Sequence, residues 1–339
     1  MSPCVGTRPV RYVSTTHFAP AMRRLQPIDG LLLVVMLVWG GNFSIVKAAL
    51  DEVPRHAFNS LRLILATALL LTTLMVLRVA PGISAMLGPG VRRAFTRSER
   101  LSAREWGAVA ALGLVGHLGY QLCFIGGLAR TTAANSALII GSTPILVALI
   151  AVILGVERVG VLHWIGTLLS MVGVSLVVGL GDSASGGALT GNLLVLGATV
   201  CWAIYTVASR PLLARHSPLV LTAYSMAFGT IGYVVVRIED VRELSWLEMS
   251  GSAWAALTFS AVFALYGAYL VWYAAIQQLG SSRTSIYANL VPVVGVAVAV
   301  LWLDEPARWP MLIGATAIVV GVGLTRGSSV VRNAPPPEE

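Results

Sequence analysis

Polar and aromatic side chains occur inside the most apolar stretches of this chain, at spacings that place several of them together. Tyr269, Trp272 and Tyr273 stand at positions i, i+3 and i+4, so they would share one face of a helix. An amide surrounded by apolar groups lacks hydrogen-bond partners, so the polar members are expected to face an enclosed interior. Rings combined with amides suit a solute that has an apolar or flat body and polar edges. The candidate solute-binding residues are Trp39, Asn42, His117, Tyr120, Gln121, Phe124, Trp202, Tyr205, Tyr269, Trp272, Tyr273, Tyr287 and Asn289, and Asn135 is a further interior amide.

A second interpretation of such side chains is structural. Rings at the ends of apolar helices anchor them at a membrane surface, and amides inside a bundle form hydrogen bonds between helices. This interpretation is preferred for the tryptophans near the ends of apolar runs, which are Trp164, Trp246, Trp254, Trp302 and Trp309.

Lys47 and Arg62 are the basic residues that fall inside apolar runs. Both lie within about two helical turns of one end of their run, so their side chains could reach the surface as anchors or pair helices. The alternative is an external vestibule that attracts a carboxylate or another anion. Ser225 occupies the position of Arg62 in the second half of the chain, and this asymmetry favours a directional role.

His117 is the titratable side chain nearest the middle of an apolar run, and no Asp or Glu stands at that depth. It is interpreted either as a hydrogen-bonded packing residue or as a proton relay, so the coupling ion stays open. The sequence contains no HExxH zinc motif, no Walker A loop, no pair of mid-run aspartates and no obvious serine partner for His117. The three cysteines show no metal-binding spacing. No catalytic residue, metal or cofactor is therefore expected, and an intramembrane enzyme is disfavoured.

The composition places these residues in a membrane protein. Hydrophobic residues make up 56% of the chain and charged residues only 11%, with a mean hydropathy of +0.80. Soluble domains carry about 25% charged residues because water must solvate their surface. The net charge of +8 does not indicate nucleic-acid binding, because the basic residues are spread between apolar runs rather than gathered in one patch.

Apolar runs predict an all-α polytopic membrane protein, since about 20 apolar residues are needed to cross the hydrocarbon layer. The predicted spans are 28–48, 57–77, 105–127, 132–154, 160–180, 189–209, 217–236, 251–278, 284–303 and 309–326. The longest connection contains Arg78, Arg92, Arg93, Arg97, Arg100 and Arg104. Because short loops rich in Lys and Arg stay cytoplasmic, both termini are predicted inside, with 16 arginines on inside segments against 5 outside.

The two halves of the chain resemble each other. At a shift of 148 residues Gly119, Pro144, Glu157, Ile165, Gly166 and Gly173 align with Gly267, Pro292, Glu305, Ile313, Gly314 and Gly321. At a shift of 163 residues Trp39 aligns with Trp202 and Lys47 with Arg210. Each half has five spans, an odd number, so the halves are expected to lie in opposite orientations. Inverted repeats of this kind create two similar gates on opposite faces with a site near the midplane.

Two aligned pairs are candidate gate elements. Pro144 and Pro292 are interpreted as mid-span bends, with Ser142 and Thr143 either satisfying a freed carbonyl or offering hydroxyls to a solute. Glu157 and Glu305 precede the last span of each half. They are interpreted either as partners of that helix's free N–H groups or as members of a switchable ion pair.

Several of these residues together resemble a known family. Trp39-Gly40-Gly41-Asn42-Phe43 followed by Lys47 is similar to the first-span signature of the EamA domain. Arg62 fits the same pattern, and so do the aligned sets Pro144, Glu157, Gly166, Gly173 and Pro292, Glu305, Gly314, Gly321. The chain therefore resembles the drug/metabolite transporter superfamily in its ten-span form with two EamA domains, over about residues 28–326. The resemblance implies export or exchange of small metabolites without ATP.

The expected organisation is a disordered cytoplasmic lead (1–27), a first repeat (28–180), a second repeat (189–326) and a cytoplasmic tail (327–339), with Met22 as an alternative start. The expected function is a secondary carrier of the cell membrane that moves a small organic solute by alternating access, and a flippase for a lipid-linked or amphipathic group is the alternative. The expected partners are a small solute and the lipid bilayer, with a homodimer left open.

Overall fold

The computed structural model describes residues 27–79, 95, 100–153, 157–159, 161–180, 186–244, 246, 249–279, 284, 287–288, 290–306, 309–327 and 330–332. The predicted N-terminal lead before residue 27, most of the basic loop after residue 79, Asn289 and the end of the C-terminal tail lie outside these ranges.

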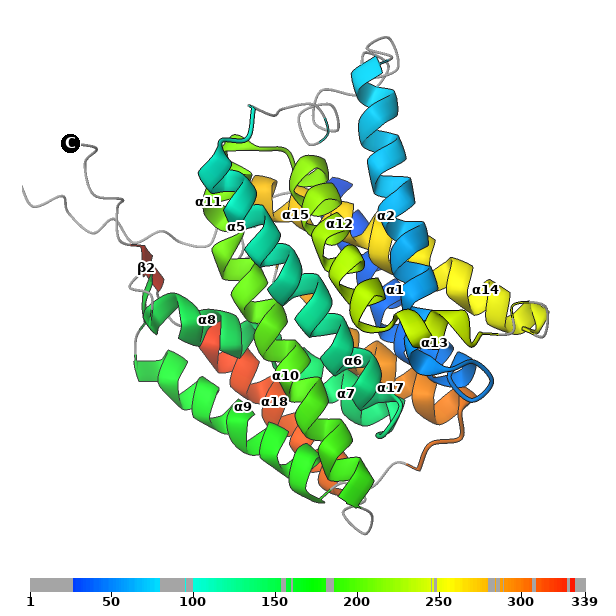
Figure 1. The fold of residues 1–339 in the computed structure, drawn as a ribbon. Helices are drawn as coiled ribbons and strands as arrows, with labels where there is room; N and C mark the ends of the chain where they lie inside the picture. The colour runs from blue at the N-terminus through cyan, green and yellow to red at the C-terminus, as the bar shows by residue number, and fades with distance from the viewer. Residues whose placement is uncertain are drawn as a thin grey trace, which may run out of the picture.

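The described part of the chain is a bundle of helices (Figure 1). The first half contains α1 (Pro27–Ala49), α2 (Arg55–Val79), α5 (Ala103–Gly113), η1 (Leu114–Gly119), α6 (Tyr120–Leu128), α7 (Ala133–Gly141), α8 (Thr143–Ile153) and α9 (Val161–Leu180). The second half contains α10 (Gly186–Ala208), α11 (Arg210–Arg215), α12 (Pro218–Val236), α13 (Ile238–Arg242), α14 (Gly251–Phe259), η3 (Ser260–Gly267), α15 (Ala268–Leu279), α17 (Leu290–Trp302) and α18 (Trp309–Gly327).

Every apolar run predicted as a span contains helix. Seven helical stretches among the described residues are long and apolar enough to cross a membrane, and two shorter apolar helices cover Leu290–Trp302 and Trp309–Gly321. One addition to the all-α expectation is a small antiparallel pair, in which β1 (Glu157–Val159) lies beside β2 (Val330–Arg332). The structure thus places Glu157 in a strand that pairs with the C-terminal segment.

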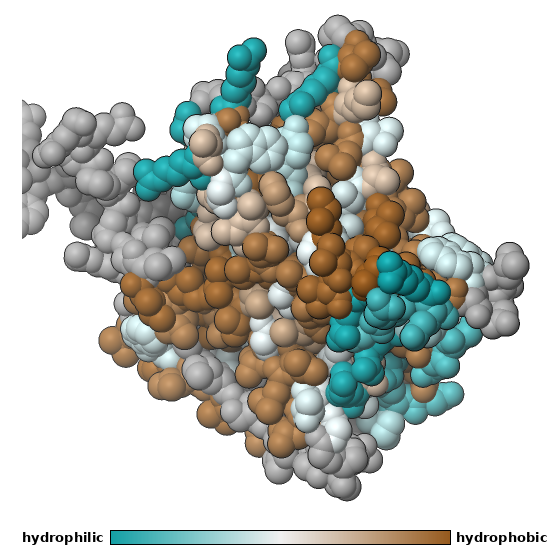
Figure 2. Space-filling view, viewed as in Figure 1, coloured by the Kyte–Doolittle hydropathy of each residue, from teal (hydrophilic) through white to brown (hydrophobic). Residues whose placement is uncertain are grey.

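The surface of the bundle is apolar across its middle. Figure 2 shows a hydrophobic band between hydrophilic patches toward the top and the lower right of the view. The tryptophans assigned to the membrane boundary are all exposed, with relative exposures of 41% for Trp164, 44% for Trp246, 39% for Trp254, 55% for Trp302 and 78% for Trp309. A surface of this kind suits lipid rather than water, and the chain is a multi-pass α-helical membrane protein.

The helices α9 and α18 pack along each other (Figure 1), and glycines let their backbones meet. A Cβ atom on Gly173 would lie 2.6 Å from the Gly314 carbonyl oxygen, and one on Gly321 would lie 2.5 Å from the Gly166 carbonyl oxygen. Since lipid offers no hydrophobic drive between helices, close contact through small residues is a main source of their association.

Two π-helical segments interrupt α-helices at corresponding positions of the two halves. The segment η1 ends at Gly119 and joins α5 to α6, and η3 ends at Gly267 and joins α14 to α15. Gly119 and Gly267 are the residues that align at a shift of 148. A π-helical turn leaves the regular hydrogen-bond pattern and frequently marks a functional site.

Pro144 lies just after a break within the apolar helical stretch Ala133–Ile150, and Pro292 lies in the first turn of its helix. Pro144 is the second residue of α8, which is separate from α7, and Pro292 is the third residue of α17. Proline is tolerated in the first turn of a helix, and the carbonyl group that its missing N–H leaves free must find another donor. The Thr143 hydroxyl donates to the Ile140 carbonyl oxygen, the acceptor that residue 144 would otherwise use, and the Ser142 hydroxyl donates to the Ile139 carbonyl oxygen.

Candidate functional site

A cavity in the interior of the bundle has an empty volume of ≈ 820 Å³, with its open end included. Its lining comes from both halves of the chain and consists of Trp39, Asn42, Phe43, Arg62, Tyr120, Gln121, Phe124, Ile140, Thr143, Pro144, Val147, Trp202, Thr206, Ala264, Leu265, Tyr269, Trp272, Ala288 and Val291.

Aromatic rings form one side of this cavity. The Trp39 ring lies 5.9 Å from that of Trp202, 6.1 Å from that of Tyr269 and 5.2 Å from that of Trp272, centroid to centroid. The Trp39 indole N–H donates to the Ala264 carbonyl oxygen in η3 at 2.9 Å, so this ring is fixed against the π-helical segment. Tyr120 stacks on Phe124 at 5.6 Å, and its ring also lies 5.6 Å from Trp202. Rings arranged in this way offer flat apolar faces to a bound molecule.

Arg62 supplies the positive charge of the cavity. Its side chain is 1% exposed, so it does not extend to the membrane surface as the anchoring interpretation required. The guanidinium donates from Nε to Asn59 at 2.8 Å, from Nη1 to Ser260 at 2.8 Å and from Nη2 to Gln121 at 2.7 Å. Its Cζ atom lies 5.7 Å from the centre of the Phe124 ring. Arg62 therefore joins α2 to α6 and η3 while facing the cavity.

The structure brings most of the predicted solute-binding residues to one cavity and places others behind it. Trp39, Asn42, Tyr120, Gln121, Phe124, Trp202, Tyr269 and Trp272 line the space. Tyr205 and Tyr273 are fully buried in a second layer, with the Tyr205 ring 5.9 Å from Trp202. Tyr287 instead donates to Asp29 at 2.8 Å, beside the first turn of α1, and Asn289 lies outside the described residues.

His117 also lies behind the lining, and its ring stacks on Tyr269 at 5.8 Å. Its Nε2 atom is 3.1 Å from the Ser225 hydroxyl, which is 2.9 Å from the Tyr205 hydroxyl. The ring is fully buried, and its hydrogen-bond partner is neutral. These contacts fit the packing interpretation, but the Nδ1 atom of His117 has no hydrogen-bond partner among the described atoms, and the proton relay stays a prediction.

Lining residues that the sequence interpretation missed include Phe43, which had entered only through the family signature, and Thr206. Thr143, considered both as a partner of a freed carbonyl and as a hydroxyl for a solute, lines the cavity too. Ile140, Val147, Ala264, Leu265, Ala288 and Val291 complete the apolar lining. Nothing in their type distinguishes an apolar residue that faces a cavity from one that faces lipid.

At one end of the bundle, Lys47 and Glu305 each connect their own segment to the end of another helix. Glu305 accepts hydrogen bonds from the backbone N–H groups of Ala133 and Ala134 at 2.7 and 2.9 Å, at the start of α7. The expected carboxylate–helix contact is thus made with α7 rather than with the following helix, which corrects the prediction. Lys47 donates from Nζ to the Leu128 carbonyl oxygen at 3.0 Å, at the end of α6. Each charge complements the partial charge of the helix end that it contacts.

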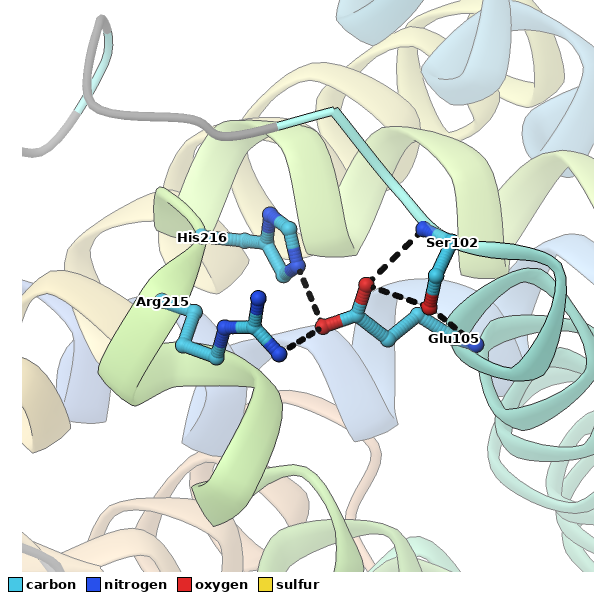
Figure 3. A network of polar contacts seen from close by, with 4 residues as sticks. All are labelled: Ser102, Glu105, Arg215 and His216. Atoms are coloured by element: carbon cyan, nitrogen blue, oxygen red, sulfur yellow. Dashed lines mark hydrogen bonds and ion pairs between the residues drawn. The ribbon is translucent and has the colours of Figure 1, made fainter.

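At the opposite end of the bundle, Glu105 connects the first half of the chain to the second (Figure 3). One carboxylate oxygen lies 3.0 Å from Arg215 Nη1 and 3.2 Å from His216 Nε2, in the connection between α10 and α12. The other oxygen accepts from the backbone N–H of Ser102 at 2.9 Å and from its hydroxyl at 2.8 Å. Glu105 thereby caps α5 and ties it to a segment of the second half.

A bundle of apolar helices around a cavity with a polar and aromatic lining defines a membrane protein of the solute-transporter class. The sequence matches the EamA-like transporter family over residues 26–179 and 189–327, so the chain belongs to this family and is a membrane transporter. The match falls into two segments, one in each half of the chain.

Named relatives agree with this assignment. The chain is 32% identical to the uncharacterized transporter YyaM of Bacillus subtilis over 243 residues, 70% of this chain and 79% of the relative. It is 29% identical to an uncharacterized transporter of Archaeoglobus fulgidus over 298 residues, 87% and 96% of the two chains. It is 27% identical to a probable terminal-alkyne amino-acid exporter of Streptantibioticus cattleyicolor over 297 residues, 86% and 91%. One solved crystal structure shares the fold with a TM-score of 0.59 and 21% identity, over 87% of this chain and 94% of that one.

Proposed function

We propose that this transporter is a secondary carrier that exports or exchanges a small organic solute, such as an amino-acid-like metabolite, by alternating access. The contact between Trp39 and Trp202 in the cavity wall carries the proposal. These residues are 163 positions apart and align between the two halves, and their rings lie 5.9 Å apart. A site built from equivalent residues of both halves can be approached from either face as the halves move.

The ten-span arrangement with two inverted repeats is part of this proposal. The family match in two segments supports a duplicated chain, and so do the π-helical segments that end at aligned glycines. Contacts between repeats support a twofold relationship. Gly173 meets Gly314 in the same way that Gly321 meets Gly166, and α1 packs on α17 as α10 packs on α7 and α8.

The proposed orientation places both termini in the cytoplasm, on the basis of the basic residues between spans. In this orientation Glu105 and Arg215 lie at the cytoplasmic end, and Lys47 and Glu305 lie at the external end. A membrane-impermeant maleimide should label a cysteine at Glu239 in intact cells, and should label one at Arg104 only after permeabilisation, in a background without native cysteines. The reverse pattern would overturn the orientation.

The relatives support the class of cargo only in general terms. One relative is named as an amino-acid exporter and others as uncharacterized transporters. The aromatic lining of the cavity, with its few polar groups, is compatible with a small organic solute that has an apolar body and polar edges.

The function is tested without a choice of cargo. Metabolites in the medium and in cells are compared between a deletion strain and an overproducing strain. Depletion of one solute class outside the deletion strain, with enrichment outside the overproducer, is the result that the proposal predicts. Unchanged solutes together with an altered lipid or envelope composition would contradict it and favour a flippase.

A further inference from the structure

Arg62 is a buried positive charge without a counter-ion in the described part of the chain. Its hydrogen-bond partners Asn59, Ser260 and Gln121 are neutral, and no carboxylate among the described residues forms an ion pair with it. The described residues that line the cavity include no Asp or Glu. A buried charge without a partner costs several kcal/mol in principle, and such charges inside membranes mark substrate pathways.

Donor groups around Arg62 remain available. Its three hydrogen bonds to Asn59, Ser260 and Gln121 leave two of the five guanidinium N–H groups for another acceptor. The amide nitrogen of Gln121 is buried without a hydrogen-bond partner in the described structure, and so is the indole nitrogen of Trp272. Arg62, Gln121 and Trp272 all line the same cavity. This set of donors requires a ligand group that is rich in acceptors.

An unpartnered acceptor is also present. Asn42 lines the cavity, and its side-chain oxygen is buried without a hydrogen-bond partner among the described atoms. It could accept from one donor of a ligand, such as a hydroxyl or an N–H group. Since the remaining lining is mostly aromatic and aliphatic, the rest of the ligand would be apolar or flat.

The positive charge of Arg62 indicates which class of ligand the cavity can hold. An ammonium ligand without a carboxylate would meet the like charge of Arg62, and a phosphate dianion would bring an excess of negative charge into an apolar cavity. A carboxylate matches both the single charge and the planar fork of the guanidinium.

We infer that the cavity binds a small organic monocarboxylate, with its carboxylate on Arg62 and Gln121 and its apolar or flat body among Trp39, Trp202 and Tyr269. This inference rests on the proposed function, because it names the substrate class of the proposed solute site.

The test uses the purified full-length protein and binding measured by tryptophan fluorescence. The probes are acetate, hexanoate and phenylacetate, each compared with the corresponding neutral amide and amine. At least one carboxylate should bind about tenfold or more tightly than its amide and its amine. Equal binding of the amide, tighter binding of the amine or no binding of any carboxylate would overturn the inference.

Two variants assign the preference to named atoms. Arg62→Gln should abolish the discrimination between carboxylate and amide, and Trp272→Phe should weaken carboxylate binding a few-fold. Trp254→Phe is the matched control, because Trp254 is exposed at 39% and does not line the cavity. A carboxylate preference that survives in folded Arg62→Gln contradicts the inference. If Arg62→Gln does not fold, wild-type discrimination and Trp272→Phe still decide the outcome.

Failure of this inference can be distinguished from failure of the proposed function. Binding of amides or amines that compete with each other at the cavity, with transport intact, would reject only the carboxylate class. Normal transport of the identified cargo by variants that fill or open the cavity would reject the cavity as the solute site.

Discussion

The hydroxyl group of Thr67 in α2 lies 2.7 Å from that of Thr230 in α12, and the two residues are 163 positions apart. This separation is the shift that aligns Trp39 with Trp202. A residue that contacts its own repeat equivalent lies close to the axis that relates the repeats. The Ser170 hydroxyl also donates to the Ile318 carbonyl oxygen at 3.2 Å, across the other shift of 148. Both contacts support the proposed inverted repeat.

The Thr67–Thr230 pair should be energetically coupled. Thr67→Val and Thr230→Val should each destabilise the protein by about 1–3 kcal/mol, because each leaves a buried hydroxyl without its partner. The double variant should be no less stable than the weaker single variant. Thermal unfolding in detergent measures the effect, with the exposed Thr316→Val as control. Strictly additive losses would mean that the contact contributes nothing.

The glycine crossing of α9 and α18 should tolerate no added methyl group. In Gly321→Ala the new Cβ atom would lie 2.5 Å from a backbone carbonyl oxygen, which cannot move without displacing a helix. We expect a loss of about 1–3 kcal/mol. Gly107→Ala is the control, since nothing lies within 4 Å of its Cβ position and alanine favours helix. An equal melting temperature for Gly321→Ala and wild type would refute this packing.

The stability that Glu105 provides by contacting the second half should depend on the negative charge of its carboxylate. Glu105→Gln keeps an acceptor for Ser102 but loses the ion pair to Arg215 and the carboxylate that contacts the buried His216. Glu105→Gln should therefore lower the melting temperature more than Arg215→Gln, whose side chain is 58% exposed. Melting temperatures of the two variants measured side by side give the comparison. A larger drop in melting temperature for Arg215→Gln than for Glu105→Gln would contradict this prediction.

The contact between Glu52, in the loop after α1, and Ser250 should stabilise the protein slightly and be lost in acid. Glu52 accepts from the Ser250 hydroxyl and from its backbone N–H, each at 2.6 Å, and these hydrogen bonds lower the pKa of Glu52 below 4.5. A lowered carboxyl pKa stabilises the folded state above the unfolded pKa, and the benefit disappears as pH falls through the folded pKa. The melting difference between wild type and Glu52→Gln should therefore be constant from pH 7 to about 5 and vanish at lower pH. A difference that grows on acidification would contradict this.

The apolar runs were sufficient to predict the helices, because a membrane imposes a length and a composition on every spanning segment. The sequence also identified eight of the residues that line the cavity, since polar and aromatic groups inside apolar runs have few other places to lie. It could not predict η1 and η3, because hydropathy is the same in α- and π-helical turns.

Contacts between segments that are far apart along the chain could not be predicted from the sequence either. Glu305 was expected to serve the helix that follows it, whereas α7 begins beside it in space. The partners of Arg62 on other helices could not be predicted, because Ser260 is 198 residues away along the chain. The position of Arg62 near the end of a span suggested the surface instead. Pairing of β1 with β2 depends on the C-terminal segment, which carried no apolar signal.

The central claim is that the cavity between the two halves is the solute site of an alternating-access carrier. Its most direct test is counterflow in proteoliposomes loaded with the solute identified by metabolite comparison. Wild type and Trp302→Ala, a control at an exposed residue that does not line the cavity, should accumulate labelled solute transiently. Trp39→Ala should reduce the initial rate about tenfold or more at equal abundance. Absence of counterflow in wild type, or an unchanged rate in Trp39→Ala, would contradict the account.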